Sequence, residues 1–344
     1  MKTVRPRVFD KQEYFYIWSV KILVVRFSSI GDIVLTTPVL RALKTQLENV
    51  EIHYLTKRSF KPVIENNPHI DMVHLIDSSI KEVISDLKSE KYDWVIDLHN
   101  NIRTKSLKIK LGRPSKKFPK LHWKKWKLVK FKKDDMPDVH VVDRYFETVA
   151  HLGVKPDQKG CDFPIPASEA VNLEKNNLEG EKFCSVVIGA KFKTKQLPIE
   201  KLKEIIQGIK LPVILIGGPE DKVLGDQLCE AVQREDVFNL CGKHSIVGSA
   251  SILQQSAKVV TNDTGMMHIA SCFDVEIISI WGNTVPSLGM YAYRPKNKSS
   301  YSLHEVAGLN CRPCSKIGFA ECPKGHFDCM QKQNSEEIVS RINS

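Results

Sequence analysis

Apolar and polar residues alternate along the chain with two periods, one typical of strands and the other typical of helices. Short β-branched runs such as residues 20–27 (VKILVVRF) and 92–99 (YDWVIDLH) predict buried strands. Segments such as residues 33–47 (IVLTTPVLRALKTQL) repeat apolar residues every three or four positions, which predicts amphipathic helices. Because the two kinds of segment alternate, we expect βαβ units and parallel sheets.

The alternating pattern is interrupted once and then resumes. Two prolines in residues 163–166 (FPIP) mark a linker, and a second series begins at residues 183–189 (FCSVVIG). Two such halves predict a cleft, since ligands of parallel sheets bind beyond the carboxyl ends of the strands. The closing segment predicts a helix, expected to pack back on the first half. The predicted units are an extension at 1–19, Rossmann-like domains at 20–162 and 167–330, and a C-terminal helix at 331–344.

Composition narrows the class of protein. With 42% hydrophobic and 26% charged residues, the chain has an ordinary globular composition. No apolar run approaches the roughly 20 residues that span a bilayer, and the opening residues lack the apolar core of a signal peptide. Nine cysteines, five of them scattered, fit a reducing compartment better than a disulfide framework. We therefore expect a cytoplasmic protein.

The net charge of +11 is concentrated in one segment. Residues 101–133 hold fourteen Lys or Arg and no Asp or Glu, so the rest of the chain carries −3. Four aromatic residues are interleaved with these lysines: Phe118, Trp123, Trp126 and Phe131. The patch predicts a polyanionic partner, either an anionic glycolipid acceptor, an inner-leaflet membrane surface or nucleic acid, and a solvated face is the alternative. Tryptophans three residues apart favour a membrane-surface helix or a flexible acceptor loop.

Polar turns follow several predicted strands and open the next helix, where ligands of parallel sheets are held. In residues 28–32 (SSIGD), Gly31 permits close backbone approach to a ligand. Asp32 is either a general base or a charge at the start of the helix. The corresponding turn of the second half, residues 188–195 (IGAKFKTK), carries three lysines that either meet a diphosphate or are solvated.

Two further turns lie in the second half. Asp221 ends residues 217–221 (GGPED), where it either accepts hydrogen bonds from sugar or ribose hydroxyls or caps a helix. In residues 261–268 (TNDTGMMH), a polar cluster opens a helix whose free amides can face a phosphate. His268 lies one turn into that helix and is either a donor to a diphosphate oxygen or a packed residue.

Together these motifs resemble glycosyltransferase family 9, the lipopolysaccharide heptosyltransferases. RFSSIGDIVLTTPVLRALK, GAKFKTKQLP, GGPED and NDTGMMHIA occur in the order and spacing of that family. YDWVIDLHNNIRTKSL and the cysteine-rich tail are also similar to it, so the resemblance extends from Val20 to the C-terminus. It implies a GT-B fold, in which two Rossmann-like domains of the α/β class face each other across a cleft.

The resemblance also implies an inverting, metal-independent sugar transfer. Asp32 matches the aspartate that deprotonates the acceptor hydroxyl, and Lys195 matches the lysine that neutralises the leaving diphosphate. The match assigns the binding of the donor to the second domain, through Asp221, Asp263, Thr264, Gly265 and His268, and we expect Ala190 and Lys191 to contact the donor as well. We expect acceptor-binding residues in the first domain: Ser29, Gly31, Arg103, Lys124 and Lys127.

Two departures from the family pattern concern the second domain. Leu197 stands where the family often has tryptophan after the catalytic lysine. The family-typical PGA is IGA here, and Ala190 and Lys191 replace hydroxyl residues that some members use. Both changes bear on donor specificity more than on catalysis.

Four cysteines near the C-terminus are clustered with the spacing C-x₂-C-x₇-C-x₆-C. Four thiols at this spacing either form a structural zinc site or remain reduced, packed thiols. The cluster consists of Cys311, Cys314, Cys322 and Cys329. We expect no catalytic role for it and no cofactor requirement for catalysis.

The leading hypothesis is therefore a heptosyltransferase that uses ADP-heptose and a Kdo- or heptose-bearing lipopolysaccharide core acceptor. Such an enzyme would work in the cytoplasm, at the inner face of the cytoplasmic membrane. A family member that uses another nucleotide sugar for envelope glycan synthesis is the alternative within the same class. A nucleic-acid-binding Rossmann protein is the alternative outside it, whereas the lack of P-loop and GxGxxG motifs argues against an ATPase or dehydrogenase.

Overall fold

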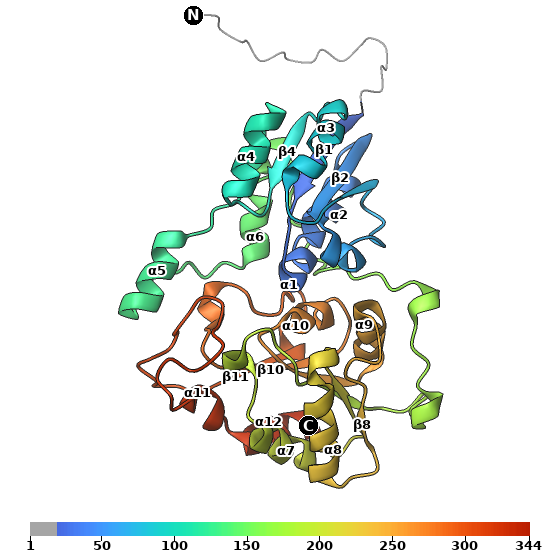
Figure 1. The fold of residues 1–344 in the computed structure, drawn as a ribbon, viewed down its shortest axis with the longest axis vertical. Helices are drawn as coiled ribbons and strands as arrows, with labels where there is room; N and C mark the ends of the chain where they lie inside the picture. The colour runs from blue at the N-terminus through green and yellow to red at the C-terminus, as the bar shows by residue number, and fades with distance from the viewer. Residues whose placement is uncertain (1–18) are drawn as a thin grey trace, which may run out of the picture.

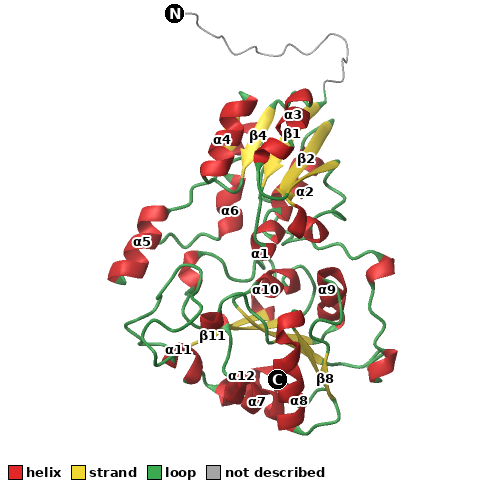
Figure 2. Cartoon of the chain, in the orientation of Figure 1, coloured by secondary structure: helices red, strands yellow, loops and turns green. Residues whose placement is uncertain are grey.

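The computed structural model describes residues 19–344, so the predicted extension at residues 1–19 lies outside the described residues except for Ser19. The chain forms two α/β halves that follow one another along the long axis of the molecule (Figure 1). Helices flank the strands of each half (Figure 2), which is the arrangement expected from the alternating pattern.

The first half contains a five-stranded parallel sheet in the order β3-β2-β1-β4-β5. Its central strand is apolar on both faces because helices cover both, with Leu23 and Val25 in one cluster and Ile22 and Val24 in another. The strands are β1 (Val20–Val25), β2 (Val50–Lys57), β3 (Met72–Ile76), β4 (Trp94–Asp97) and β5 (Ser115–Lys117). The helices are α1 (Ile30–Val34), α2 (Thr37–Gln46), α3 (Ile84–Ser89), α4 (Ile102–Leu111), α5 (His122–Phe131) and α6 (Val141–Phe146).

The second half contains a six-stranded parallel sheet in the order β11-β10-β9-β6-β7-β8. The strands are β6 (Cys184–Val187), β7 (Val213–Ile216), β8 (Val237–Asn239), β9 (Lys258–Asn262), β10 (Glu276–Trp281) and β11 (Tyr301–Glu305). The helices are α7 (Ile199–Gly208), α8 (Lys222–Val232), α9 (Ile246–Gln255), α10 (Gly265–Ala270), α11 (Asp328–Gln331) and α12 (Ser335–Asn343). The exact domain boundaries stay predictions.

Hydrophobic periodicity located the elements better than it located their ends. The periodic segment 80–90 (IKEVISDLKSE), which predicts one helix, is divided into a 3-10 turn at Ile80–Glu82 and α3, because the Ser79 hydroxyl and the Glu82 carboxylate close a capping box around that turn. The basic segment forms α4, β5 and α5, so the aromatic-rich part of it is a helix and not a loop.

The expectation that the last helix packs on the first half was wrong. α12 packs on α7 and β10, both in the second half. Ile338 and Ile342 are buried in the core of that half, and the Asn343 amide donates to the Gly208 carbonyl at 2.9 Å. The apolar face of α12 therefore completes the second domain.

Within residues 19–344, every helix is too short or too polar to traverse a lipid bilayer.

Candidate active site

The two halves meet where α1 packs on α10, and glycine allows the close contact from both sides (Figure 1). A Cβ on Gly31 would lie 2.2 Å from Cδ2 of His268. A Cβ on Gly265 would lie 2.9 Å from Cβ of Ile30. The SSIGD and NDTGMMH turns, which are more than 200 residues apart in sequence, therefore touch through positions that no larger residue could occupy unchanged.

Asp32 lies beside this contact, in the first turn of α1, and is partly exposed. Its carboxylate forms an ion pair with the Arg26 guanidinium at 2.6 Å and accepts the Ser29 hydroxyl at 2.8 Å. Burial by itself would raise the pKa of Asp32, but the Arg26 charge and the Ser29 hydrogen bonds hold that pKa below its ordinary value. Asp32 is therefore ionised at neutral pH and can accept a proton.

Arg26 is itself held in place by the first half. Its guanidinium donates to the carbonyl oxygens of Ser28 and Leu98 and to the Tyr145 hydroxyl, at 2.7, 2.6 and 3.2 Å. These contacts leave little freedom for the guanidinium. The orientation of the Asp32 carboxylate is consequently fixed by a chain of hydrogen bonds that begins in β1 and α6.

Lys195 enters the site from the second half, at the end of the 3-10 turn Lys193–Lys195. Its ammonium lies 2.5 Å from the carboxylate of Asp263 and donates to the Asp263 carbonyl oxygen at 3.0 Å. The Thr284 hydroxyl donates to the same carboxylate at 2.8 Å. Asp263 is buried, so this pair positions the cation at the N-terminal end of α10.

His268 lies between the Asp32 and Lys195 groups and is only 3% exposed. Burial and the Lys195 charge lower its pKa to about 4, although the carboxylates of Asp263 and Asp32 act in the opposite direction. The imidazole is therefore neutral near pH 7. Its Nδ1 atom is buried and has no hydrogen-bond partner among the residues that the structure describes.

The remaining predicted donor residues surround the carboxyl ends of β6 and β7. The Asp221 carboxylate is buried against Gly189 and Gly217 and accepts the Gly218 amide at 2.8 Å, and burial raises its pKa. It thus closes the glycine-rich turn, as the capping alternative predicted, at the base of the donor side of the cleft. The neighbouring loop after β6 holds Ala190, whose carbonyl accepts the Gln196 amide at 2.8 Å.

Lys191 and Thr264 are the remaining residues that we predicted to bind the donor. The Lys191 ammonium lies 5.7 Å from the centre of the Phe192 ring, which is a cation–π distance. Thr264 precedes α10, and its hydroxyl lies 3.5 Å from that of Thr261. Ala190 and Lys191 lie in the loop between β6 and Lys195, Thr264 and Gly265 directly follow Asp263, and the binding roles of all four stay predictions.

The structure adds polar groups that the motifs did not single out. Asn262 ends β9, and Asn283 and Thr284 follow β10. All three side chains are buried, and Oδ1 of the Asn262 side chain and both polar atoms of the Asn283 side-chain amide have no partner within residues 19–344. Buried polar groups without partners at a cleft are typical of a ligand site. The signal in the sequence was the polar GNT turn after a strand, which resembles the turns at the other strand ends.

The comparisons with known proteins agree with this geometry. The model of "Glycosyltransferase family 9 (heptosyltransferase)" matches residues 80–318. The chain belongs to glycosyltransferase family 9. The family 9 match begins after α1, so the role of Asp32 is argued from its contacts and from the motif around it.

Several relatives are similar over most of this family 9 chain. Lipooligosaccharide heptosyltransferase 2 of Haemophilus influenzae is 26% identical, covering 77% of this chain and 84% of that protein. Lipopolysaccharide heptosyltransferase 1 of Escherichia coli K12 is 23% identical, covering 78% of this chain and 89% of that protein.

Solved structures confirm the GT-B architecture. A family 9 glycosyltransferase from Veillonella parvula superimposes with a TM-score of 0.72 at 20% identity, covering 95% of this chain and 97% of that one. The E. coli heptosyltransferase WaaC, solved with ADP, gives 0.66 at 18% identity, covering 94% and 99%. The predicted two-domain α/β fold is thus confirmed.

The acceptor side of this family 9 cleft is lined by more cations than the sequence singled out. Burial is the largest effect on Lys120 and lowers its pKa, although the Asp32 carboxylate acts to raise the pKa of both Lys120 and Lys125. Burial, followed by the charge of Arg144, nevertheless lowers the pKa of Lys125 to about 8. Lys316 of the second half contributes a third positive charge to the group. These lysines therefore lie within electrostatic reach of the Asp32 carboxylate or of one another.

The residues that we predicted to bind the acceptor lie in different parts of the first half. Ser29 and Gly31 lie at the base itself, and the Arg103 guanidinium sits 5.5 Å from the centre of the Phe27 ring. Arg103 also lines a surface pocket with hydroxyl, amide and cationic groups: Ser78, Ser79, Asn101, Ser106 and Lys110. Lys124 and Lys127 lie on the exposed surface of α5, where a contact with an acceptor stays a prediction.

α5 stands apart from both sheets, at the side of the molecule (Figure 1). Its aromatic residues are unusually exposed: 74% for Trp123, 49% for Trp126 and 62% for Phe131. Trp126 makes edge-to-face contacts with the other two rings, at centroid distances of 5.4 and 5.1 Å. Just after the helix, the Lys132 ammonium donates to the Pro313 carbonyl of the second half at 2.7 Å.

The cysteine tail is close to that same loop. The Cys314 thiol lies 3.1 Å from the Cys311 carbonyl oxygen, and the Cys311 sulfur lies 3.8 Å from Nε2 of His326. Cys329 is buried, and all nine cysteines are free thiols. Among the described residues, the group whose ligand atoms converge closely enough for a metal ion is instead His53, His74 and Glu90. Zinc binding by the four cysteines stays a prediction.

Proposed function

We propose that the chain is an inverting glycosyltransferase that moves heptose from ADP-heptose onto a Kdo- or heptose-bearing lipopolysaccharide core acceptor. One observation carries the proposal. The ionised Asp32 of the first half and the Lys195–Asp263 pair of the second half both lie close enough to the buried His268 for their charges to act on its pKa, and Gly31, next to Asp32, packs against the His268 ring. The family membership and the names of the relatives support the choice of sugar and acceptor.

Asp32 acts as the general base. It takes the proton from the acceptor hydroxyl while that oxygen attacks the anomeric carbon, which contributes typically about 10²–10⁴-fold to the rate. Because the base comes from the first half and the leaving group is held by the second, attack occurs on the face opposite the departing phosphate. The configuration at the anomeric carbon is therefore inverted.

Lys195 stabilises the departing diphosphate. Its ammonium is already oriented by Asp263, so the donor phosphates gain a fixed cation where negative charge develops. His268 is neutral and offers one N–H to a phosphate oxygen or sugar hydroxyl, without adding charge. A protein cation thus takes the place that a metal ion occupies in other nucleotide-sugar enzymes.

The adenine nucleotide is favoured over other donors by the solved neighbours. WaaC structures carry ADP and ADP-2-deoxy-2-fluoro heptose, with TM-scores of 0.66 and 0.62 to this chain. The buried amide of Asn283 and the turn around Asp221 provide the polar groups for the sugar and ribose hydroxyls.

The acceptor is anionic. Lys120 and Lys125 lie within electrostatic reach of Asp32, Lys316 adds a third positive charge near them, and carboxylate or phosphate groups on the acceptor would neutralise these charges. Arg103 and its pocket extend this cationic surface away from the reacting hydroxyl.

We also propose that α5 rests on the inner face of the cytoplasmic membrane. Its exposed indole and phenyl rings are suited to the headgroup region, and its lysines are attracted to anionic lipids at about 1 kcal/mol each. Sedimentation with vesicles tests this: phosphatidylglycerol vesicles should bind the protein, neutral phosphatidylcholine vesicles should not, and Trp123→Ala/Trp126→Ala should weaken binding. Equal binding to both vesicle types would contradict it.

The enzymatic proposal is tested by ADP release from ADP-heptose in the presence of a Kdo-lipid acceptor. Asp32→Asn should lose at least about 100-fold in kcat with unchanged circular dichroism. Asp77→Asn is the matched control, since it removes a carboxylate that is paired with Arg58 on the surface of the same half. Normal turnover by Asp32→Asn would refute the assigned base.

The two alternatives give different results. A family member with another donor would be stabilised in thermal shift by a GDP- or UDP-sugar and not by ADP-heptose. A nucleic-acid-binding protein would bind oligonucleotides tightly with a steep salt dependence and would release no ADP from the sugar donor.

A further inference from the structure

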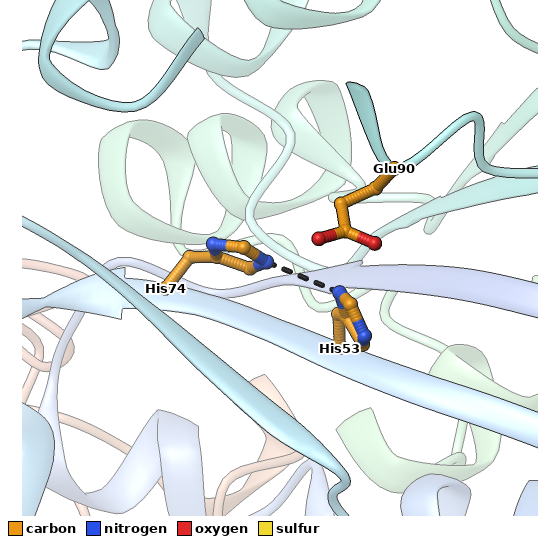
Figure 3. A group of neighbouring side chains, drawn as sticks. All are labelled: His53, His74 and Glu90. Atoms are coloured by element: carbon orange, nitrogen blue, oxygen red, sulfur yellow. Dashed lines mark hydrogen bonds between the residues drawn. The ribbon is translucent and has the colours of Figure 1, made fainter. Parts of the chain in front are cut away.

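A second cluster of polar side chains lies away from the cleft, on the face of the first sheet that packs against α3 (Figure 3). His53 comes from β2, His74 from β3, and Tyr92 and Glu90 from the segment between α3 and β4. His53 and His74 lie in the middle of β2 and β3, whereas Asp32 follows the carboxyl end of β1. It is separate from the transfer site, and nothing in the proposed reaction uses it.

Three of its heteroatoms form a small triangle. Nδ1 of His53 lies 3.1 Å from Nε2 of His74 and 2.8 Å from the Tyr92 hydroxyl oxygen, which is 3.0 Å from the same His74 nitrogen. The ligand atoms of His53, His74 and Glu90 all lie within 4.8 Å of one another. Figure 3 shows the Glu90 carboxylate directed toward the gap between the two rings.

The tautomer of His53 leaves a lone pair directed into this triangle. Its other ring nitrogen, Nε2, lies 2.7 Å from the Glu51 carboxylate, which accepts only. The proton is therefore on Nε2, and Nδ1 is unprotonated. A carboxylate that accepts from the far nitrogen of a histidine is the usual second partner of a metal-binding imidazole.

The separation of the two imidazole nitrogens also suits the binding of one ion. Nδ1 of His53 and Nε2 of His74 are 3.1 Å apart, so each can lie about 2.1 Å, the zinc–nitrogen distance, from an ion that the Glu90 carboxylate also approaches. Two imidazoles and a carboxylate form a familiar zinc ligand set. His53 and Tyr92 are fully buried and His74 nearly so, which holds the donors in place.

We propose that His53, His74 and Glu90 bind a structural zinc ion, with the Tyr92 hydroxyl beside the fourth position. The ion would replace Lys21, whose ammonium now lies 2.7 Å from the Glu90 carboxylate. Lys21 would keep its contact with Glu51 at 3.1 Å. The bound ion would tie β2 and β3 to the turn before β4, and so stabilise the first half without taking part in sugar transfer.

The experiment uses the full chain, treated with a chelator and then titrated with zinc by calorimetry. One zinc ion should bind, and Tm should rise with zinc concentration. His74→Gln and Glu90→Gln should each weaken zinc binding by at least about tenfold. Glu90 lies at the surface, so its variant stays folded by circular dichroism even if His74→Gln does not.

Two controls separate this site from other sources of binding. His69→Gln removes a partly exposed histidine of the same half and should leave zinc affinity unchanged. Cys311→Ser/Cys314→Ser removes the other predicted metal cluster and should leave the first-half site intact. Cobalt bound at the proposed site should lack the sulfur charge-transfer band that thiolate ligands give.

The outcomes are distinct. Absence of zinc binding would overturn the proposal, as would equal zinc affinity in wild type, His74→Gln and Glu90→Gln. Complete loss of zinc in the cysteine variant would assign the ion to the tail instead. ADP release should be the same with and without chelator, so failure of this proposal would leave the transferase proposal untouched.

Discussion

Gly31→Ala tests whether the contact between the two halves controls catalysis. The added methyl group would lie 2.2 Å from Cδ2 of His268, whereas ordinary contacts begin near 3.4 Å. Either α1 or the imidazole must therefore move by about 1.2 Å. His268 is buried, and the backbone of α1 carries Asp32 one residue further on, so the movement displaces the base or its neighbour.

The expected losses of catalytic rate and of stability follow from these distances. A misplacement of about 1 Å in an active site can cost about 10²-fold in rate, which corresponds to about 2.7 kcal/mol. Overpacking of a close contact lowers the free energy of unfolding by about 1–3 kcal/mol. We expect kcat/KM for ADP release to fall about 100-fold in Gly31→Ala, with a smaller loss of stability in urea unfolding.

Removing the ring that clashes provides the decisive comparison. In the background of His268→Ala, Gly31→Ala should have little additional effect, because the methyl group then meets no imidazole. Gly248→Ala is a control within a helix, where the nearest atom would be 3.1 Å away, and it should be nearly neutral. Additive effects of Gly31→Ala and His268→Ala on kcat/KM would refute the steric explanation.

Three further predictions concern charges. Lys195→Met should lower kcat and reduce the free energy of unfolding by about 3 kcal/mol, since Asp263 stays buried without its cation. The double variant with Asp263→Asn should regain stability in urea unfolding but should not regain ADP release. The acceptor KM should rise as the pH passes about 8, where Lys125 loses its charge, and Lys125→Arg should flatten that rise in initial-rate measurements. The free energy of unfolding should fall by about 3–4 kcal/mol between pH 7 and pH 5. His140 and His268 have folded pKa values of about 3 and about 4, so both stay neutral in the folded protein while they bind protons near pH 6.5 in the unfolded chain. A free energy of unfolding that does not change over this pH range would contradict the prediction.

Local patterns were sufficient to predict the order of strands and helices and the turns that carry the site. Each of the SSIGD and NDTGMMH turns follows an apolar strand and opens a helix, so both were expected at carboxyl ends of parallel strands. The local sequence patterns do not indicate how the two halves dock on each other. The contact of Gly31 with His268 depends on how two separately folded sheets dock.

The histidine cluster shows the same limit inside one domain. His53 and His74 are each the only histidine of their strand, and a single buried histidine in a strand does not indicate a ligand site. Their nitrogens meet because β2 and β3 pair in a register that places His74 opposite Leu55, two residues beyond His53 on the same face. Register between strands is set by packing across the whole sheet, so the sequence did not suggest this site.

The lysines of α5 differ from the histidine cluster, because the helical period of the sequence is sufficient to separate the lysines on one face of the helix from those on the other. Leu128 and Val129 are the residues of the helix that turn toward the protein, and Lys125 precedes them by three and four positions. These three residues therefore share one face of the helix, which is less exposed than the face that carries Lys127. We predicted acceptor contacts for Lys124 and Lys127, whereas the helical period of Leu128 and Val129 indicates Lys125, the lysine of this helix on whose pKa Asp32 acts.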